Sequence, residues 1–281
     1  MVVNPFDTFD AIYCITIRAN KERQASARAI ADHLGIPMQF YYVDKHPRGG
    51  AYGALHSHIQ LVKMLYRKGI QNALIFEDDF VPTPGYSPQI MQDVVEFITT
   101  NKQWEILQLG YSPLKHVYDI SWIYSFVNTQ IVNKNKTIIK HIGLATHAYC
   151  LSRRGMQKIV EDSERVLAME TPPPPQIDAW YSHLLTHTYA TSPIQFDQKW
   201  CLPTDNIPQK FVEKVFYRPA QCYAEKYQLF YHLSLLPTQH RILVNAILVI
   251  LFAIILLIVY SIAKHIWSSR SRRPVRSRTR R

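Results

Sequence analysis

The stretch LIFEDDF, residues 74–80, is an apolar run that ends abruptly in three acids, Glu77, Asp78 and Asp79. A short apolar run of this kind is typical of a strand that is buried on both faces of a sheet. The acids after it have two interpretations. They form a solvated turn that caps the next segment, or they form a site that binds a cation or a ligand.

The segments before LIFEDDF predict an α/β fold. Residues 11–17 and 38–43 are rich in β-branched and aromatic side chains, which favour strands. After each of these strands, apolar residues recur at helical spacing, over 27–34 and over 55–66, and a glycine follows. The order strand, helix, strand, helix, strand predicts a mostly parallel sheet with crossover helices. The three acids then lie at its carboxyl edge, where open α/β sheets bind ligands.

The rest of the chain continues this alternation less regularly. The pattern predicts a helix over 90–98, strands over 104–110 and 146–152, and helices over 156–167 and 177–185. Residues 111–140 have weak periodicity and are expected to form a loop or an acceptor-side insertion. The prolines at 172–175 are expected to break the helix before them. Residues 200–240 have no clear period, so we expect them to close the domain and connect it to the C-terminal segment.

Residues 242–263 form an uncharged run of 22 residues in which Asn245 and Ser261 are the clearly polar side chains. As a helix, this run would be about 33 Å long, enough to cross a bilayer. A buried core helix is the alternative, but core helices seldom have such a long apolar stretch. We therefore predict a C-terminal transmembrane helix.

The charge of the chain is concentrated after this helix. Residues 264–281 carry eight of the 11 excess positive charges and no acid, so the rest of the chain has a net charge of only +3. This distribution argues against specific nucleic-acid binding by the body of the protein. The arginine-rich tail is typical of a contact with anionic lipid headgroups or of a topology determinant.

The side of the membrane on which the body lies stays open. The N-terminal segment resembles no cleavable signal, which favours a cytosolic body, whereas the positive-inside rule places the arginine tail in the cytosol and the body across the membrane. Asn135-Lys136-Thr137 is a glycosylation sequon, and Cys201 and Cys222 could pair in an oxidising compartment. Cys14 and Cys150 lie in apolar runs and are expected to be buried thiols.

A second pattern lies just upstream of the acids. Gly49, Gly50 and Gly53 come at the start of a predicted helix, where backbone N–H groups can approach a phosphate without obstruction by side chains. A hard divalent cation bound by carboxylates and phosphate oxygens would bridge the glycines and the acids. Together they predict a site for a metal and a diphosphate.

Several motifs, in this order, resemble glycosyltransferase family 25, which includes lipooligosaccharide and collagen hydroxylysine galactosyltransferases. They are ITIRANKERQAS, GALHSHIQLVKMLY, LIFEDD, THAYCLSRRGMQKIV and QIDAWYSHLL, and they cover roughly residues 10–206. The resemblance implies a GT-A type nucleotide-sugar-binding domain and an inverting transferase that usually needs manganese. The family has a glycine-cysteine or glycine-alanine lead-in to its serine-histidine pair; here the lead-in is GALH, and His56 directly before Ser57 is an unusual neighbour.

The resemblance also implies roles for the acids. Asp79 matches the direct ligand of Mn²⁺ or Mg²⁺, Asp78 matches a partner of the ribose or the sugar, and Glu77 completes the donor-binding motif. A cation bound to the carboxylate would stabilise the negative charge that develops on a departing nucleoside diphosphate.

Four further residues match positions that bind the donor. Arg18 and Arg23 follow the first strand, where they could contact the nucleotide, although a solvated helix start is an equal alternative. Ser57 and His58 match the serine-histidine pair of the family. His58 is also spaced for the apolar face of its helix, so a histidine packed in the core remains a comparable interpretation.

An inverting transfer needs a base that accepts the proton of the acceptor hydroxyl. Asp178 matches the acid that follows a proline in the family, and it is our candidate for the base. Its alternative is a helix N-cap, and one residue could fill both roles. His147 could contact the acceptor.

These observations predict four segments: a catalytic domain over 8–210, a connector over 211–241, a membrane helix over 242–263 and a basic tail over 264–281. The predicted function is transfer of a hexose, galactose or glucose, from a UDP-sugar to a glycan or protein acceptor. The alternative is a catalytically inactive module of the same fold that binds a glycan or a partner at a membrane.

Overall fold

The computed structural model describes residues 4–113, 120–169, 176–199, 222–223 and 225–271. The chain divides into two compact units, Met1–Gln239 and His240–Arg281. Several predictions lie outside the described residues: the proline run, the end of the catalytic domain, much of the connector, the last residues of the basic tail, and Cys201.

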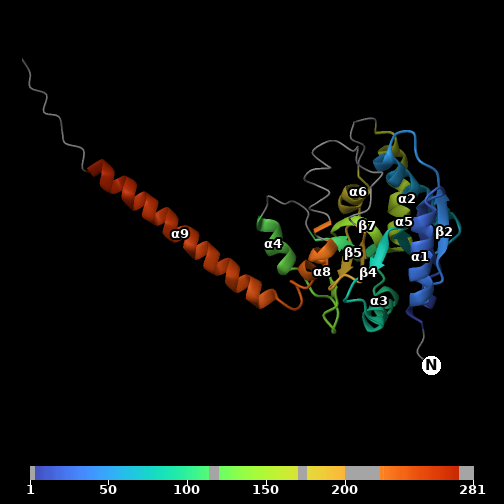
Figure 1. The fold of residues 1–281 in the computed structure, drawn as a ribbon, viewed down its shortest axis with the longest axis horizontal. Helices are drawn as coiled ribbons and strands as arrows, with labels where there is room; N and C mark the ends of the chain where they lie inside the picture. Colours follow the sequence, from blue (N-terminus) through green and yellow to red (C-terminus); the bar gives the residue numbers. More distant parts are fainter. Residues whose placement is uncertain (1–3, 114–119, 170–175, 200–221, 224, 272–281) are drawn as a thin grey trace, which may run out of the picture. The chain divides into compact units, whose positions relative to one another are not determined.

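The first unit begins with the predicted alternation of strands and helices (Figure 1). Its elements are η1 (Pro5–Thr8), β1 (Ala11–Ile17), α1 (Lys21–Leu34), β2 (Gln39–Val43), α2 (Gly50–Arg67) and β3 (Asn72–Glu77). β1 pairs in parallel with both β2 and β3, which confirms the predicted parallel arrangement of these strands. Helix α1 ends because Gly35 adopts a left-handed conformation, with φ at 66°.

The second half of the unit adds antiparallel pairings. Its elements are β4 (Phe80–Pro82), α3 (Pro88–Thr100), β5 (Ile106–Ser112), α4 (Ile120–Val127), β6 (Ile138–Ile139), β7 (Leu144–Ser152), α5 (Arg153–Leu167), α6 (Ile177–Leu184), β8 (Thr188–Thr191) and β9 (Phe196–Gln198). The seven-stranded sheet has the order β2-β1-β3-β7-β5-β8-β6. β7 inserts antiparallel between β3 and β5, while β5 and β8 are parallel, so the sheet is mixed.

The loop predicted over residues 111–140 is in part regular structure. It contains α4 and the short strand β6, which pairs antiparallel with β8 at the edge of the sheet. β6 has only two residues, too few to show a period in the sequence. Its pairing with β8 joins residues about fifty positions apart, which local patterns cannot reveal.

Helices cover both faces of the sheet and form two apolar cores. α1 and α3 pack on one face, against alternate residues of β1, β3, β5 and β7 such as Leu74 and Phe76. α2, α5 and α6 pack on the other face, against the residues between them such as Ala73 and Ile75. Both faces of β3 are therefore buried, which explains the continuous apolar run before the acids. Burial of each large side chain contributes about 1.5–3 kcal/mol.

The end of the first unit folds back onto the sheet. The last residue of α8 (Leu229–Ser234) docks against Ser192, whose Oγ donates to the Ser234 carbonyl oxygen at 2.6 Å. Cys14 and Cys150 are buried free thiols, as predicted, and Cys222 is disulfide-bonded.

The second unit contains one long helix, α9 (Arg241–Ser271), drawn in red in Figure 1. Within the described residues, Arg241–Ile262 is the one helix long and apolar enough to cross a membrane, with a mean hydropathy of 3.4 and no buried part. Length and composition alone support the predicted span.

Candidate active site

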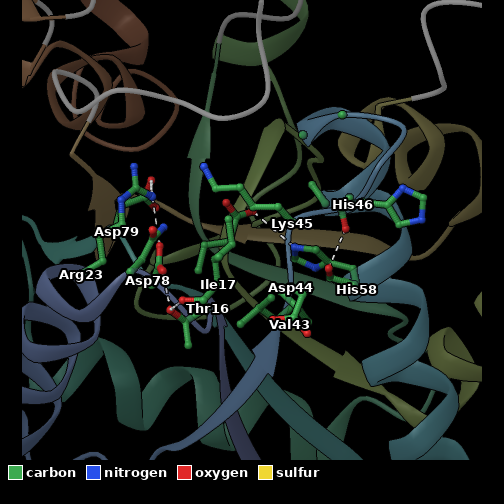
Figure 2. A pocket seen from close by; sticks show the side chains of 18 residues that line it. Thr16, Ile17, Arg23, Val43, Asp44, Lys45, His46, His58, Asp78 and Asp79 are labelled. Carbon is green, nitrogen blue, oxygen red and sulfur yellow. Dashed lines mark hydrogen bonds and ion pairs between the residues drawn. The ribbon is translucent and has the colours of Figure 1, made fainter.

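A cavity of about 330 Å³ lies at the carboxyl ends of β1, β2 and β3 and at the start of α2. Its walls include the three acids, the glycines at 49, 50 and 53, and residues at the ends of β1 and β2. Figure 2 shows Arg23 beside Asp78 and Asp79, with His58 elsewhere on the wall and Lys45 extending between them in this view. The cavity therefore occupies the edge of the sheet that the sequence indicated.

The packing of aromatic side chains holds the two aspartates in a tight turn between β3 and β4. The rings of Phe76 and Phe80 stack at 4.4 Å, and Phe196 on β9 packs against both. The Lys199 amide N–H also donates to the Asp79 carbonyl oxygen at 2.9 Å. Since apolar side chains anchor both ends of this turn, its carboxylates are directed toward the cavity.

Asp78 is enclosed by two donors. Thr16 Oγ1 donates to Asp78 Oδ2 at 2.6 Å, and Arg23 Nη1 donates to Asp78 Oδ1 at 3.0 Å. Burial raises the pKa of Asp78, and the two donors only partly offset this effect. Thr16 was not singled out in the sequence, because its contact with Asp78 joins residues 62 positions apart.

Asp79 has fewer partners. Arg23 Nη1 lies 3.2 Å from Asp79 Oδ2, whereas Oδ1 is buried and has no hydrogen-bond partner among the described residues. Burial and the neighbouring charges of Glu77 and Asp78 raise the pKa of Asp79 to about 7, against the opposing effect of Arg23. The unpartnered oxygen is a place where a cation would relieve an electrostatic cost.

Glu77 has a different environment. Its Oε1 accepts a hydrogen bond from Thr146 Oγ1 at 2.7 Å and lies 3.4 Å from His58 Nε2. Burial would raise the pKa of Glu77, but the contacts with His58 and Thr146 outweigh it and lower the pKa to about 2. Glu77 is therefore ionised.

The start of α2 forms another wall. Gly49, with φ at 91°, is the N-cap residue of α2 and has no side chain to cap the helix. The first backbone N–H groups of α2 are therefore available to a ligand. A Cβ on Gly49 would meet no atom within 4 Å, so its left-handed backbone and not crowding favours glycine here. Lys45 and His46, which the sequence reasoning missed, also line this wall. The helix dipole and Lys45 together favour an anion.

The cavity brings together most of the predicted site residues. Its lining includes Arg23, Ser57, His58, Glu77, Asp78 and Asp79. Ser57 is buried and donates from Oγ to the Gly53 carbonyl oxygen at 2.6 Å. Residues from separate segments of the sequence thus line one common cavity.

Two predicted residues do not line this cavity. The Arg18 side chain is 61% exposed and its Nε lies 3.7 Å from Asp44 Oδ1. Asp178 lies in the first turn of α6, where its Oδ2 accepts from the Ala145 amide N–H at 2.9 Å and its Oδ1 from the Ala179 amide N–H at 2.7 Å. The N-cap of α6 is Gln176, so Asp178 is a first-turn acid and not the cap.

His147 is fully buried, and its Nε2 lies 3.3 Å from the Phe196 carbonyl oxygen. Burial lowers its pKa. A direct contact with an acceptor, as the sequence suggested, would require this buried ring to become accessible.

The fold is that of an α/β protein with a cavity at the carboxyl edge of its parallel strands. The sequence profile of glycosyltransferase family 25, described as an LPS biosynthesis protein, matches residues 3–171, which is more than half of the chain. The protein therefore belongs to glycosyltransferase family 25 and is a glycosyltransferase. A comparison with curated proteins found no match.

Solved structures offer only distant likenesses. One is a glycosyltransferase involved in the glycosylation of the major capsid of PBCV-1, at 9% identity, a TM-score of 0.40, and coverage of 77% of this chain and 99% of that one. Another is UDP-glucose pyrophosphorylase complexed with UDP-glucose, at 10% identity, a TM-score of 0.35, and coverage of 67% and 74%. A197 from STIV has 12% identity, a TM-score of 0.33, and coverage of 64% and 80%. These scores are too low to indicate a substrate.

Proposed function

We propose that this protein transfers a hexose, galactose or glucose, from a UDP-sugar to a glycan or protein acceptor, with inversion at the anomeric carbon, in a GT-A type domain. The observation that carries the proposal is the cavity itself, where the unpartnered Oδ1 of Asp79 and the uncapped start of α2 line one space. The carboxylate of Asp79 attracts a cation, whereas the start of α2 attracts an anion. A diphosphate that carries a divalent cation satisfies both.

The residues of the cavity fit such a cation as a partial ligand set. Within the described residues, no group of three or more His, Cys, Asp or Glu side chains is arranged to bind a metal. Asp79 Oδ1 would supply a protein ligand, and oxygens of the diphosphate would complete the shell, as Mg²⁺ and similar cations prefer near phosphates. Bound Mn²⁺ or Mg²⁺ would supply charge stabilisation for the leaving UDP.

Other residues of the cavity bind and orient the donor. The first N–H groups of α2 and the Lys45 ammonium bind the diphosphate, while Arg23 and Asp78 bind the nucleoside side of the donor. Glu77 and Ser57 contact the sugar end. This division of roles assigns the diphosphate to Lys45 and the start of α2, and the nucleoside to the ion pair of Arg23 and Asp78.

Asp178 is the proposed base. Both of its carboxylate oxygens accept one backbone N–H, which fixes the orientation of the carboxylate, and each oxygen retains another lone pair for an acceptor proton. These contacts tie the start of α6 to the start of β7. The proposed base thus lies on packed elements and not on a free loop.

We also propose that α9 anchors the enzyme to a membrane as a single-pass C-terminal helix. Its apolar surface is exposed in the described chain, and water is a poor environment for a helix of this composition. An anchored enzyme would act on acceptors at that membrane surface. The side of the membrane is not part of the proposal.

The test is release of UDP by the full-length protein in detergent, with a panel of UDP-sugars and Mn²⁺, for the wild type and Asp79→Asn. Asp32→Asn, which changes an exposed aspartate on α1, is the matched control. Release from one donor that EDTA and Asp79→Asn abolish, but Asp32→Asn does not, would support the proposal. A folded protein that binds no nucleotide sugar would contradict it and favour the inactive binding module.

A further inference from the structure

Four side chains form a connected polar chain behind the cavity: Thr146, Glu77, His58 and Tyr149. His58 Nδ1 lies 2.6 Å from the Tyr149 hydroxyl, and His58 Nε2 lies 3.4 Å from Glu77 Oε1. Thr146 Oγ1 donates to the same Oε1 at 2.7 Å. His58 and Tyr149 are 1% and 0% exposed, so the contact between them is buried.

The chemistry of these groups determines the direction of each hydrogen bond. Glu77 Oε1 accepts from Thr146 Oγ1 and faces His58 Nε2, so the proton on that side of the ring belongs to Nε2. In a neutral imidazole, Nδ1 is then an acceptor, and the Tyr149 hydroxyl donates to it. Burial raises the pKa of Tyr149, which keeps its proton available for this bond.

This arrangement leaves no ring nitrogen of His58 facing a ligand. Both nitrogens point at protein groups, whereas the sequence left open whether His58 binds the donor or packs in the core. By contrast, the contacts of Glu77 with Thr146 and His58 both involve Oε1, while the Glu77 side chain is 27% exposed at the cavity. The second oxygen, Oε2, is therefore the one that a ligand hydroxyl can approach.

We propose that His58 and Tyr149 are positioning residues that fix the Glu77 carboxylate so that Oε2 accepts a hydrogen bond from a hydroxyl of the donor sugar. This inference rests on the proposed function. Tyr149 comes from β7 and His58 from α2, so the polar chain also ties the sugar-binding acid to two elements on either side of it. A carboxylate held by two donors on one oxygen loses the freedom to rotate, which lowers the entropic cost of binding.

The alternative is that His58 and Tyr149 only stabilise the core. Tyr181 offers a matched control for this alternative, because it packs against Tyr149 with ring centroids 5.9 Å apart and is 1% exposed. Its hydroxyl meets no partner at hydrogen-bond distance and angle among the described residues, but it lies near enough to the Tyr149 hydroxyl for each to affect the pKa of the other. Tyr181→Phe and Tyr149→Phe thus remove the same atom from the same layer of the core, but only Tyr149→Phe removes the contact with His58.

The experiment compares these variants as full-length proteins in detergent. Binding of UDP-glucose and UDP-galactose in the presence of Mn²⁺ is measured by calorimetry, stability by thermal unfolding, and the ¹⁵N signals of the His58 ring by NMR. The His58 signals are assigned from their loss in His58→Gln. We expect Tyr149→Phe to weaken donor binding by about 10- to 100-fold and to shift the His58 signals, as removal of supporting hydrogen bonds does elsewhere. Tyr181→Phe should change donor affinity less than about twofold by comparison.

Conservative replacement of His58 gives a second measurement if Tyr149→Phe fails to fold. The side-chain amide of His58→Gln can donate to Glu77 Oε1 as Nε2 does, whereas His58→Leu cannot. Positioning predicts that His58→Gln retains more donor affinity than His58→Leu. Equal losses in these two variants would overturn it.

Two other results separate the inference from the proposed function. Donor affinity that is equal in Tyr149→Phe and Tyr181→Phe would overturn the positioning role while the transferase remains. If the wild type binds no UDP-sugar, the proposed function fails, and the His58 signals still decide the geometry. If neither Tyr149→Phe nor Glu77→Gln shifts the His58 signals, the polar chain does not exist. If both variants shift these signals, the polar chain is supported.

Discussion

Glu105 and Asp79 are acids in the same domain with opposite surroundings. Glu105, just before β5, is fully buried and meets Lys158 Nζ at 2.7 Å, Arg154 Nε at 3.1 Å and the amide N–H of Thr186 at 2.8 Å. Burial would raise its pKa, but these partners outweigh burial and lower the pKa to about 2. Asp79 has one arginine contact and a buried oxygen without a partner, and its pKa is raised to about 7.

The difference between the two acids supports a structural role for Glu105 and agrees with the binding role proposed for Asp79. Positive groups and backbone donors satisfy Glu105, so its charge ties β5 to α5 and to the segment before β8. Asp79 retains an unsatisfied oxygen at the cavity, which costs stability in the free protein and is available to a ligand. Substitutions should therefore affect stability at Glu105 and activity at Asp79.

The largest effect is expected from Asp79→Asn. The rate of sugar transfer should fall by about 10²–10³-fold, because the variant loses the charge that binds the cation near the leaving group. The free energy of unfolding should stay the same or rise by up to about 1 kcal/mol, since a poorly paired buried charge is removed. Steady-state UDP release and urea unfolding measure the two quantities. A large loss of stability would contradict the contrast with Glu105.

Glu105→Gln should have the reverse effects, with stability lost and transfer activity retained. We expect the free energy of unfolding at pH 7 to fall by about 3 kcal/mol, because Lys158 and Arg154 lose their buried counter-charge. Transfer activity below the unfolding temperature should be nearly normal. Glu161→Gln, at an exposed acid on α5, is the control and should leave the urea midpoint unchanged.

The contribution of Glu105 should also depend on pH. Its pKa lies at about 2 in the folded state against 4.5 as the ordinary value, so between these values the unfolded state binds more protons. Stability from this group is complete above about pH 4.5 and is lost as the pH falls toward 2. The difference in unfolding free energy between wild type and Glu105→Gln should therefore shrink over this range. If the difference in unfolding free energy stays constant from pH 4.5 down to about 2, the stabilising role assigned to Glu105 is contradicted.

Arg23→Gln should have an intermediate effect. The free energy of unfolding should fall by about 2 kcal/mol, because Asp78 and Asp79 lose the guanidinium that separates their charges. Added Mn²⁺ should restore part of this loss by binding the folded state. Arg28→Gln, on the same helix but bonded to the Met38 carbonyl oxygen, should show no such recovery in thermal unfolding. Equal recovery in both variants would argue against a cation at the aspartates.

The smallest effect is expected from Arg18→Ala. Its side chain is largely exposed and does not line the cavity, so donor affinity should fall by no more than about fivefold, or 1 kcal/mol. Calorimetry with the UDP-sugar identified by the release assay measures this change. A tenfold loss of donor affinity would instead support the nucleotide contact that the sequence predicted for Arg18.

Local patterns predicted much of the fold and of the site. The first three strands and their helices, the acids at the edge of the sheet and the glycine-led start of α2 were all evident from spacing and composition. The antiparallel insertion of β7 and the contacts of Thr16 and Tyr149 were not, because they join residues 60 to 90 positions apart. Such contacts depend on packing between elements, which no short stretch encodes.

The chain's own order of residues determined that an apolar strand ends in three acids, that a glycine-led helix precedes it, and that an apolar helix lies near the C-terminus. Only the tertiary structure decided which acid each partner meets. Glu77 is held by His58 and Thr146, Asp78 by Thr16 and Arg23, and Asp79 retains a buried oxygen without a partner among the described residues. The physical reason is that burial and neighbouring charge set the properties of a carboxylate, and both arise only when distant segments pack together.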